Sequence, residues 1–217
     1  MCYSIFLYAD DIPLIAPTVS GLQAILTACE TELINIDMCV NVSKSKCIRF
    51  RFEAPCMDLV STFGGNIKWV DSCRYLGVCF VSGRTFKCNF DHAKSRVFKA
   101  FNTVYGKVGY LASEEVVLGL LHSKCLPILL YVTEACPLLS HNKQSLEFTI
   151  TRIFMNIFQT GSLAVVTECQ FNFNFMRIQS QINICTAKFL NKFILSENRL
   201  CSLFAAKTAY QLSQTIL

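Results

Sequence analysis

The chain has 217 residues and a formal net charge of +5, and 53% of its residues are hydrophobic while 16% are charged. This composition excludes a disordered tail, which combines low hydrophobicity with high net charge, and the length suffices to bury a core. The most apolar stretch, residues 116–139, is interrupted by Lys124 and Glu134 and is therefore no membrane span. Residues 1–8 lack the basic region of a secretory signal. We therefore expect an intracellular protein of the cytoplasm or nucleus.

The first third of the chain predicts strands and one helix. Aromatic and β-type residues at 3–8 and the apolar residues at 12–16 predict two strands joined by a polar turn that contains Asp10 and Asp11. Apolar residues at helical intervals predict an amphipathic helix over 21–38, begun by a cap at Ser20, with Glu30, Glu32 and Asp37 facing water. Residues 47–50 should return as a strand, and 67–70 with 75–81 as a hairpin.

From about residue 90 the apolar period becomes helical. We expect helices over 90–108, from Ser113 to about His122 or beyond, over 145–160 with Gly161 closing the helix, and over 175–195. The change of pattern predicts a domain boundary near residues 83–92. The fold class is therefore α+β, with a mixed domain over 1–85 and an all-helical domain over 86–217.

Charge is unevenly distributed along the chain. Residues 1–43 hold five acids and no Lys or Arg, whereas residues 44–107 hold twelve basic and four acidic residues. An acidic segment followed by a basic one suits a cation site beside a polyanion, although a chance fluctuation on a solvated surface explains it equally well. The thirteen cysteines form no C-x-x-C pair and predict reduced thiols, with a zinc site at Cys79, Cys88 and His92 as the alternative.

The two adjacent carboxylates of Asp10 and Asp11 suggest a metal site. Carboxylates this close repel each other unless a cation neutralises them. Mg²⁺ takes one or two protein carboxylates together with substrate phosphates, and two such ions about 4 Å apart stabilise both the attacking and the leaving oxygen of a phosphoryl transfer. From the dipeptide alone a plain Asp-Asp turn is the commoner explanation, because Asp is a common turn residue.

The segments around this turn resemble, in order, the reverse transcriptase of LINE-type (non-LTR) retrotransposons. Residues 7–12 (LYADDI) resemble the Y-A-D-D signature, and the helix over 21–38 resembles the palm helix that follows it. Residues 41–45 (NVSKS) resemble the N-x-x-K-[ST] element, and residues 74–78 (RYLGV) resemble the Y-L-G primer grip. Residues 98–109, 114–115 and 124–138 resemble the thumb. The resemblance is strong over 1–160 and weaker beyond.

The resemblance implies a partial palm of antiparallel hairpins with a packed helix, followed by a helical thumb. It implies Mg²⁺-dependent, RNA-directed DNA polymerisation on an RNA template with a DNA primer. Asp10 and Asp11 would bind two catalytic Mg²⁺ ions, and Lys44 would lie close to the leaving pyrophosphate. The residues that would contact primer or duplex are Tyr8 at the primer terminus, Tyr75, Leu76 and Gly77 in the primer grip, and Lys94, Lys99 and Lys107 on phosphates.

The family also uses a third carboxylate and nucleotide-binding fingers, both upstream of the Y-A-D-D turn. Because the present sequence starts seven residues before Tyr8, we expect that it does not polymerise DNA alone. We also expect an open palm edge that a missing N-terminal half or another chain would cover. Two other functions stay open: a non-catalytic nucleic-acid-binding remnant, and an interaction protein that uses its apolar helices.

Overall fold

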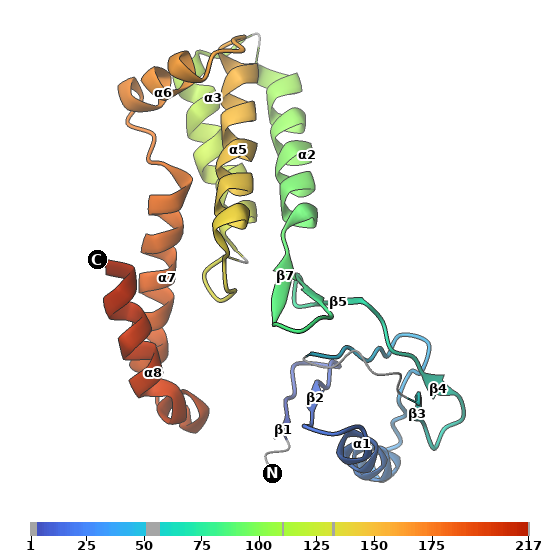
Figure 1. Cartoon of the computed structure of the whole chain (residues 1–217). Helices are drawn as coiled ribbons and strands as arrows, with labels where there is room; N and C mark the ends of the chain where they lie inside the picture. The colour runs from blue at the N-terminus through green and yellow to red at the C-terminus, as the bar shows by residue number, and fades with distance from the viewer. Residues whose placement is uncertain (1–3, 51–56, 110, 132, 217) are drawn as a thin grey trace. The chain divides into compact units, whose positions relative to one another are not determined.

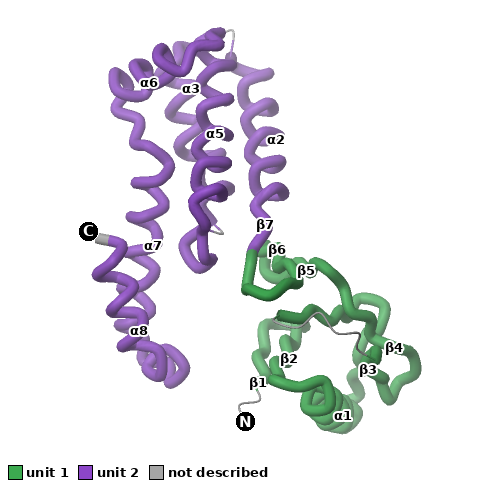
Figure 2. Tube along the Cα trace, in the orientation of Figure 1, with its two compact units in different colours: residues 1–87 green, residues 88–217 purple. Residues whose placement is uncertain are grey.

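The computed structural model describes residues 4–50, 57–109, 111–131 and 133–216 (Figure 1). The chain is an α+β protein with helices and small antiparallel sheets. It divides into two compact units, residues 1–87 and residues 88–217, close to the division expected after residue 85 (Figure 2). The correspondence of these units to a palm and a thumb stays a prediction.

The first hairpin of unit 1 is present but short. Strand β1 (Ser4–Ile5) pairs antiparallel with β2 (Leu14–Ile15), and an isolated bridge joins Tyr8 to Asp11. Phe6 donates its backbone N–H to the Pro13 carbonyl at 3.0 Å, but Pro13 has no N–H to return. The ladder is therefore interrupted, which explains why the strands are shorter than the expected 3–8 and 12–16.

Helix α1 (Val19–Ile34) begins and ends earlier than the expected 21–38. Thr18, not Ser20, is the N-cap, and its Oγ1 accepts a hydrogen bond from the Gly21 N–H at 3.1 Å. At the other end Asp37 adopts a φ of 55°, a left-handed conformation that continues no helix. The expectation that Glu30 faces water is wrong, because its side chain is fully buried.

Five further short strands were only partly anticipated. β3 (Leu59–Val60) pairs with β4 (Asn66–Ile67), and β5 (Ser72–Tyr75) with β6 (Val78–Val81), both antiparallel; β7 (Lys87–Asn89) completes a sheet of order β5-β6-β7. The expected pairing of 67–70 with 75–81 is wrong, since a hairpin turn lies inside 75–81. The expected strand at 47–50 contributes only isolated parallel bridges, from Cys47 to Trp69 and from Phe50 to Gly83.

Unit 1 is held together by an apolar core and a polar seam. The core consists of Leu26, Cys47, Leu59 and Ile67, with Trp69 packed against it. The polar seam joins α1 to β3 and the residues that follow it. In this seam the Gln23 side-chain amide pairs with the backbone of Val60, donating to its carbonyl at 2.7 Å and accepting from its N–H at 2.8 Å. About two helical turns further along α1, the buried Glu30 accepts hydrogen bonds from residues 61 and 62.

Unit 2 begins with α2 (Asp91–Val108), which confirms the helix expected over 90–108. The helix expected from Ser113 is divided into α3 (Glu114–Leu120), a π-helical turn η1 (Leu121–Cys125) and α4 (Leu126–Leu130). Ser113 is the N-cap residue of α3, but its hydroxyl makes no capping hydrogen bond. The π-turn ends just before Pro127, which cannot donate a helical N–H and whose ring disturbs regular α-helical bonding.

The remaining helices are α5 (Ser140–Ile157), α6 (Leu163–Asn172), α7 (Ile178–Ile194) and α8 (Arg199–Ile216). α5 ends at Ile157, and Gln159 adopts a φ of 48°, so Gly161 does not close it as expected. α6 and α8 were not anticipated. The core of unit 2 is formed by fully buried side chains of α2, η1, α4, α5 and α7, the largest being Phe101 and Phe154. None of the helices in the described ranges is long and apolar enough to cross a membrane.

Candidate functional site

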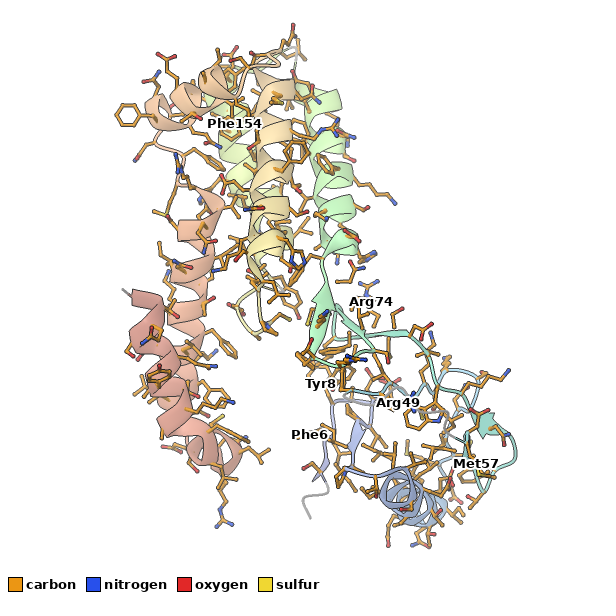
Figure 3. All side chains as sticks on the ribbon, in the orientation of Figure 1. Phe6, Tyr8, Arg49, Met57, Arg74 and Phe154 are labelled. Atoms are coloured by element: carbon orange, nitrogen blue, oxygen red, sulfur yellow. The ribbon has the colours of Figure 1, made fainter. Side chains whose placement is uncertain are left out.

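The residues 8–11 form the tip of the β1–β2 hairpin (Figure 3 labels Tyr8). The backbones of Tyr8 and Asp11 exchange hydrogen bonds in both directions at 3.0 Å, so the loop proper consists of Ala9 and Asp10. Ala9 has a φ of 53°, whereas Asp10 does not have positive φ, as in the II′ class of hairpin turns. The two loop positions are thus Ala9 and Asp10 rather than Asp10 and Asp11, and Asp11 pairs with Tyr8 in the bridge.

The side chains of this tip point to solvent. Tyr8 is 61% exposed, and Asp10 and Asp11 are also exposed. Neither carboxylate has an ion-pair partner in the part of the chain that the structure describes. Two unpaired carboxylates on a tight hairpin, open to an incoming phosphate, are a donor set that fits Mg²⁺, which would supply charge neutralisation to a phosphoryl transfer. Asp10 and Asp11 are the residues that would hold it.

The candidate site offers no third protein ligand among the described residues, where no group of three His, Cys, Asp or Glu side chains could hold a metal ion. The zinc alternative at Cys79, Cys88 and His92 therefore gains no support. The cysteines among the described residues are free thiols. Burial, with smaller contributions from Asp58 and Cys73, raises the pKa of Cys47 to about 11, which suits an inert core thiol rather than a metal ligand.

Lys44 lies on a turn that Asn41 organises. The Asn41 side-chain oxygen accepts from the Ser43 hydroxyl at 2.7 Å and from the Lys44 N–H at 3.1 Å, and the Asn41 carbonyl accepts from the Ser45 hydroxyl at 2.9 Å. Asn41, Ser43 and Ser45 therefore stabilise the turn, because their side chains satisfy its polar groups. The Lys44 side chain is exposed and is left to interact with solvent or ligand.

The three residues of the expected primer grip lie at the β5–β6 turn. Tyr75 is the last residue of β5 and pairs with Val78, so that Leu76 and Gly77 form a two-residue loop. Both loop residues have positive φ, 46° and 82°, which is the pattern of a type I′ turn. Gly77 adopts this conformation without strain, while Leu76 does not, and Leu76 is 41% exposed.

The lysines expected to meet phosphates lie on α2 of unit 2, but they do not share one environment. Lys94 is engaged within the unit: its Nζ lies 2.6 Å from an Asp91 carboxylate oxygen and donates to the Ser145 hydroxyl at 2.9 Å. This ammonium also lowers the pKa of Asp91. Lys99 and Lys107 are exposed, and their side chains have no ion-pair partner among the described residues; about 80° around the helix separates them, at the α-helical period of about 100° per residue.

A shallow pocket of about 270 Å³ lies beside Lys94, between α2 and α5. Phe98, Phe148 and Arg152 contribute to its lining, and the Arg152 guanidinium lies 5.9 Å from the centroid of the Phe148 ring. Arg152 is exposed and was not singled out from the sequence, since it falls within a strongly apolar helical pattern. An exposed guanidinium beside an aromatic ring is suited to contact nucleic-acid phosphates or bases.

The described contacts thus bring Tyr8, Asp10 and Asp11 together on one hairpin tip and Tyr75, Leu76 and Gly77 on another turn of unit 1. Lys44 stands on a third turn, and no hydrogen bond or ion pair joins it to the two carboxylates in the described ranges. Comparison with known proteins identifies no relative: no protein-family model, no curated protein and no solved structure matches the chain.

Proposed function

We propose that this chain is part of an RNA-directed DNA polymerase of the LINE type, in which Asp10 and Asp11 bind Mg²⁺ for nucleotidyl transfer. The observation that carries the proposal is the ordered series of elements, from residues 7–12 through 41–45 and 74–78 to the thumb-like segments, which begins at two adjacent carboxylates. The exposure of both carboxylates at a hairpin tip supports it, because a polymerase metal site must admit substrate phosphates.

The positions of the other candidate residues are compatible with this role. Lys44 and Leu76 are exposed on turns of the same unit, as residues that contact a nucleotide or primer need to be. Lys99 and Lys107 on α2 and Arg152 on α5 are exposed and available to duplex phosphates, whereas Lys94 is engaged with Asp91 and Ser145. We therefore assign phosphate contact to Lys99, Lys107 and Arg152 and a structural role to Lys94.

The two-carboxylate site sets what the chain does by itself. With no third ligand among the described residues, the ions would depend on substrate phosphates for coordination, and charge stabilisation of the transition state would be incomplete. We expect the isolated chain to bind primer-template in a salt-dependent manner and not to extend the primer. Incorporation of nucleotides by the purified chain with Mg²⁺, abolished by Asp10→Asn, would refute the expected inactivity and establish the polymerase.

Metal binding can be measured without catalysis. Mn²⁺, a paramagnetic substitute for Mg²⁺, is titrated into the full chain, and its free concentration is followed by electron paramagnetic resonance. We expect Asp10→Asn and Asp11→Asn each to weaken binding. Asp37→Asn is the matched control, since Asp37 is an exposed acid of the same unit with a φ of 55° that Asn adopts readily. Equal Mn²⁺ affinity in all of these variants would exclude the metal site.

Primer-template binding distinguishes the polymerase fragment from the two other functions. Anisotropy of a labelled RNA–DNA primer-template at rising salt should show affinity that falls steeply, because cations released from phosphates drive binding. If the chain binds primer-template but the Asp10 and Asp11 substitutions leave its Mn²⁺ affinity unchanged, it is a non-catalytic nucleic-acid-binding remnant. Absence of salt-sensitive binding favours the protein-interaction alternative. Reading the transcript upstream of the Met1 codon supplies an independent test. An in-frame extension that encodes a strand with the third metal-binding aspartate would support the polymerase.

A further inference from the structure

Helix α8 packs one face within unit 2 and leaves a row of large apolar side chains exposed. α8 runs alongside α7 (Figure 1), against which Thr208 is buried and Cys201, Ala205 and Leu212 are partly buried. Beside this packed face, and extending around the helix away from it, lie four exposed side chains: Leu200, Leu203, Phe204 and Tyr210, with exposures of 46%, 76%, 55% and 68%. We call these four residues the outer stripe.

The outer stripe has the spacing of a helix-packing surface. Leu203 and Phe204 follow Leu200 by three and four positions, and Tyr210 follows Leu203 by seven, so all four lie on one side of the helix. Single exposed apolar residues are ordinary, but a contiguous row of large ones marks an interaction site. Aromatic and leucine side chains in this arrangement match the anchors that an opposing helix accepts.

The charges around the outer stripe specify its partner. Arg199 and Lys207 lie on the same side of α8, and α8 contains no Asp or Glu. From α7 to the end of α8, residues 178–216, the chain carries four basic residues and one acid, Glu197. A second copy of this chain would bring the same cations against the stripe, which is unfavourable on desolvation. Nucleic acid would match the charges but would leave Leu203 and Phe204 without an apolar partner.

We propose that the outer stripe of α8 docks an amphipathic helix of a partner protein, in which an apolar seam is flanked by Asp or Glu. The seam would cover Leu203 and Phe204, and the acids would pair with Arg199 and Lys207 at the rim. The outer stripe shares no residue with the candidate metal site or with the α2 lysines, and the proposal does not depend on polymerase activity.

The test uses the full chain and a designed peptide of about three heptads with Leu at the seam positions and Glu beside them. A second peptide of the same composition, scrambled so that it has no apolar face, is the reference. Fluorescence anisotropy should detect binding of the first peptide only, weaker at about 300 mM than at about 50 mM salt because the rim charges are screened. Binding of both peptides with equal affinity would refute the proposal.

Variants locate the binding on α8. The double substitution Leu203→Ser and Phe204→Ser should weaken the peptide at least about tenfold, and Lys207→Glu should weaken it and remove the salt dependence. Phe171→Ser is the matched control, because Phe171 is 84% exposed on α6 and should not affect binding. Unchanged binding in the double variant would overturn the proposal.

Three other occupants are distinguished by the same variants. Binding to vesicles of phosphatidylcholine with phosphatidylserine, lost in the double variant while no peptide binds, would assign the stripe to a membrane surface instead. Concentration-dependent self-association in sedimentation velocity, abolished by the double variant, would assign it to a second copy. Binding of labelled nucleic acid, lost in the double variant while no peptide binds, would assign it to nucleic acid. Each of these results would replace the acidic helix.

Discussion

The buried carboxylate of Glu30 is the most informative residue to perturb. It is fully buried on α1, and it accepts three hydrogen bonds: from the Ser61 hydroxyl at 2.5 Å, the Thr62 N–H at 2.9 Å and the Thr62 hydroxyl at 2.8 Å. These bonds connect residues about thirty positions apart in the chain and fix α1 against the β3–β4 hairpin. Glu30→Gln keeps the size of the side chain but replaces one acceptor oxygen with an NH₂ group.

The magnitude follows from the three bonds. Hydrogen bonds to a charged group contribute about 1.5–3 kcal/mol each, neutral ones about 0.5–1.5 kcal/mol, and a buried donor left without an acceptor costs about 1–3 kcal/mol. In Glu30→Gln at least one donor loses its acceptor, and the other bonds lose their charge. Because the variant also removes the desolvation cost of the buried charge, we expect a net loss of about 2 kcal/mol in the free energy of unfolding.

The single tryptophan of the chain supplies the assay. Trp69 packs against the core of unit 1 and donates its indole N–H to the Met57 carbonyl at 3.0 Å, so its fluorescence reports the unfolding of this unit in urea. Glu32→Gln is the matched control, since Glu32 is an exposed acid of the same helix, and should change stability by less than about 0.5 kcal/mol. A loss in Glu30→Gln no greater than in Glu32→Gln would refute the reasoning.

The same carboxylate makes unit 1 sensitive to acid. Burial alone would raise the pKa of Glu30, but the hydrogen bonds from Ser61 and Thr62 outweigh it and lower the pKa below 4.5. The unfolded chain therefore binds a proton more readily than the folded one, so this contribution to stability is complete above about pH 4.5 and is lost as pH falls through the lowered pKa. The Trp69 transition of Glu30→Gln should depend less on pH in this range than that of the wild type.

Three further substitutions or modifications test local geometry. Thr18→Ala removes the cap of α1 and should cost about 1 kcal/mol by Trp69 fluorescence, whereas Ser20→Ala, at the cap that the sequence predicted, should cost less than about 0.5 kcal/mol; the reverse order would contradict the structure. Leu76→Asn relieves the positive φ of the β5–β6 turn and should stabilise unit 1 by up to about 1 kcal/mol; any destabilisation would argue against the type I′ turn. Iodoacetamide near pH 8 should label the exposed Cys39 in the native protein but Cys47 only after unfolding. The reason is that a thiol with a pKa of about 11 is ionised in only about one part per thousand at this pH. Equal labelling rates for both thiols would show that Cys47 is not buried.

Local pattern predicted those elements whose buried face is made of large apolar residues. α2, α5 and α7 bury residues such as Phe101, Ile150 and Ile182 at helical intervals, and the sequence predicted all three helices. α8 was missed because its packed face consists mainly of small and polar residues, Ala205 and Thr208 among them, while most of its large apolar residues are exposed. Periodicity measures the strongest hydrophobic face, and that face is not always the buried one.

The remaining errors concern partners that are distant in sequence. Glu30 was expected to face water because an acid on a helix usually does, and its partners Ser61 and Thr62 cannot be located from a window around it. The candidate site was more accessible to prediction. The hairpin tip at 8–11 was predicted correctly as a turn between strands, but the loop at Leu76–Gly77 was taken for strand because Leu is rare at positive φ. The engagement of Lys94 by Asp91 and Ser145 likewise depends on a helix fifty residues away.

The pairing of Gln23 with Val60 protects a strand edge through which copies of this protein could aggregate at high concentration. A ribbon of two short strands offers backbone N–H and C=O groups on its outer side, and such groups recruit strands from neighbouring molecules into aggregates. The Gln23 carboxamide has the same donor and acceptor pair as a peptide group and satisfies both Val60 groups, at 2.7 and 2.8 Å. It therefore takes the place of a strand residue at that edge, and a shorter side chain such as Asn would leave the edge open to a neighbour.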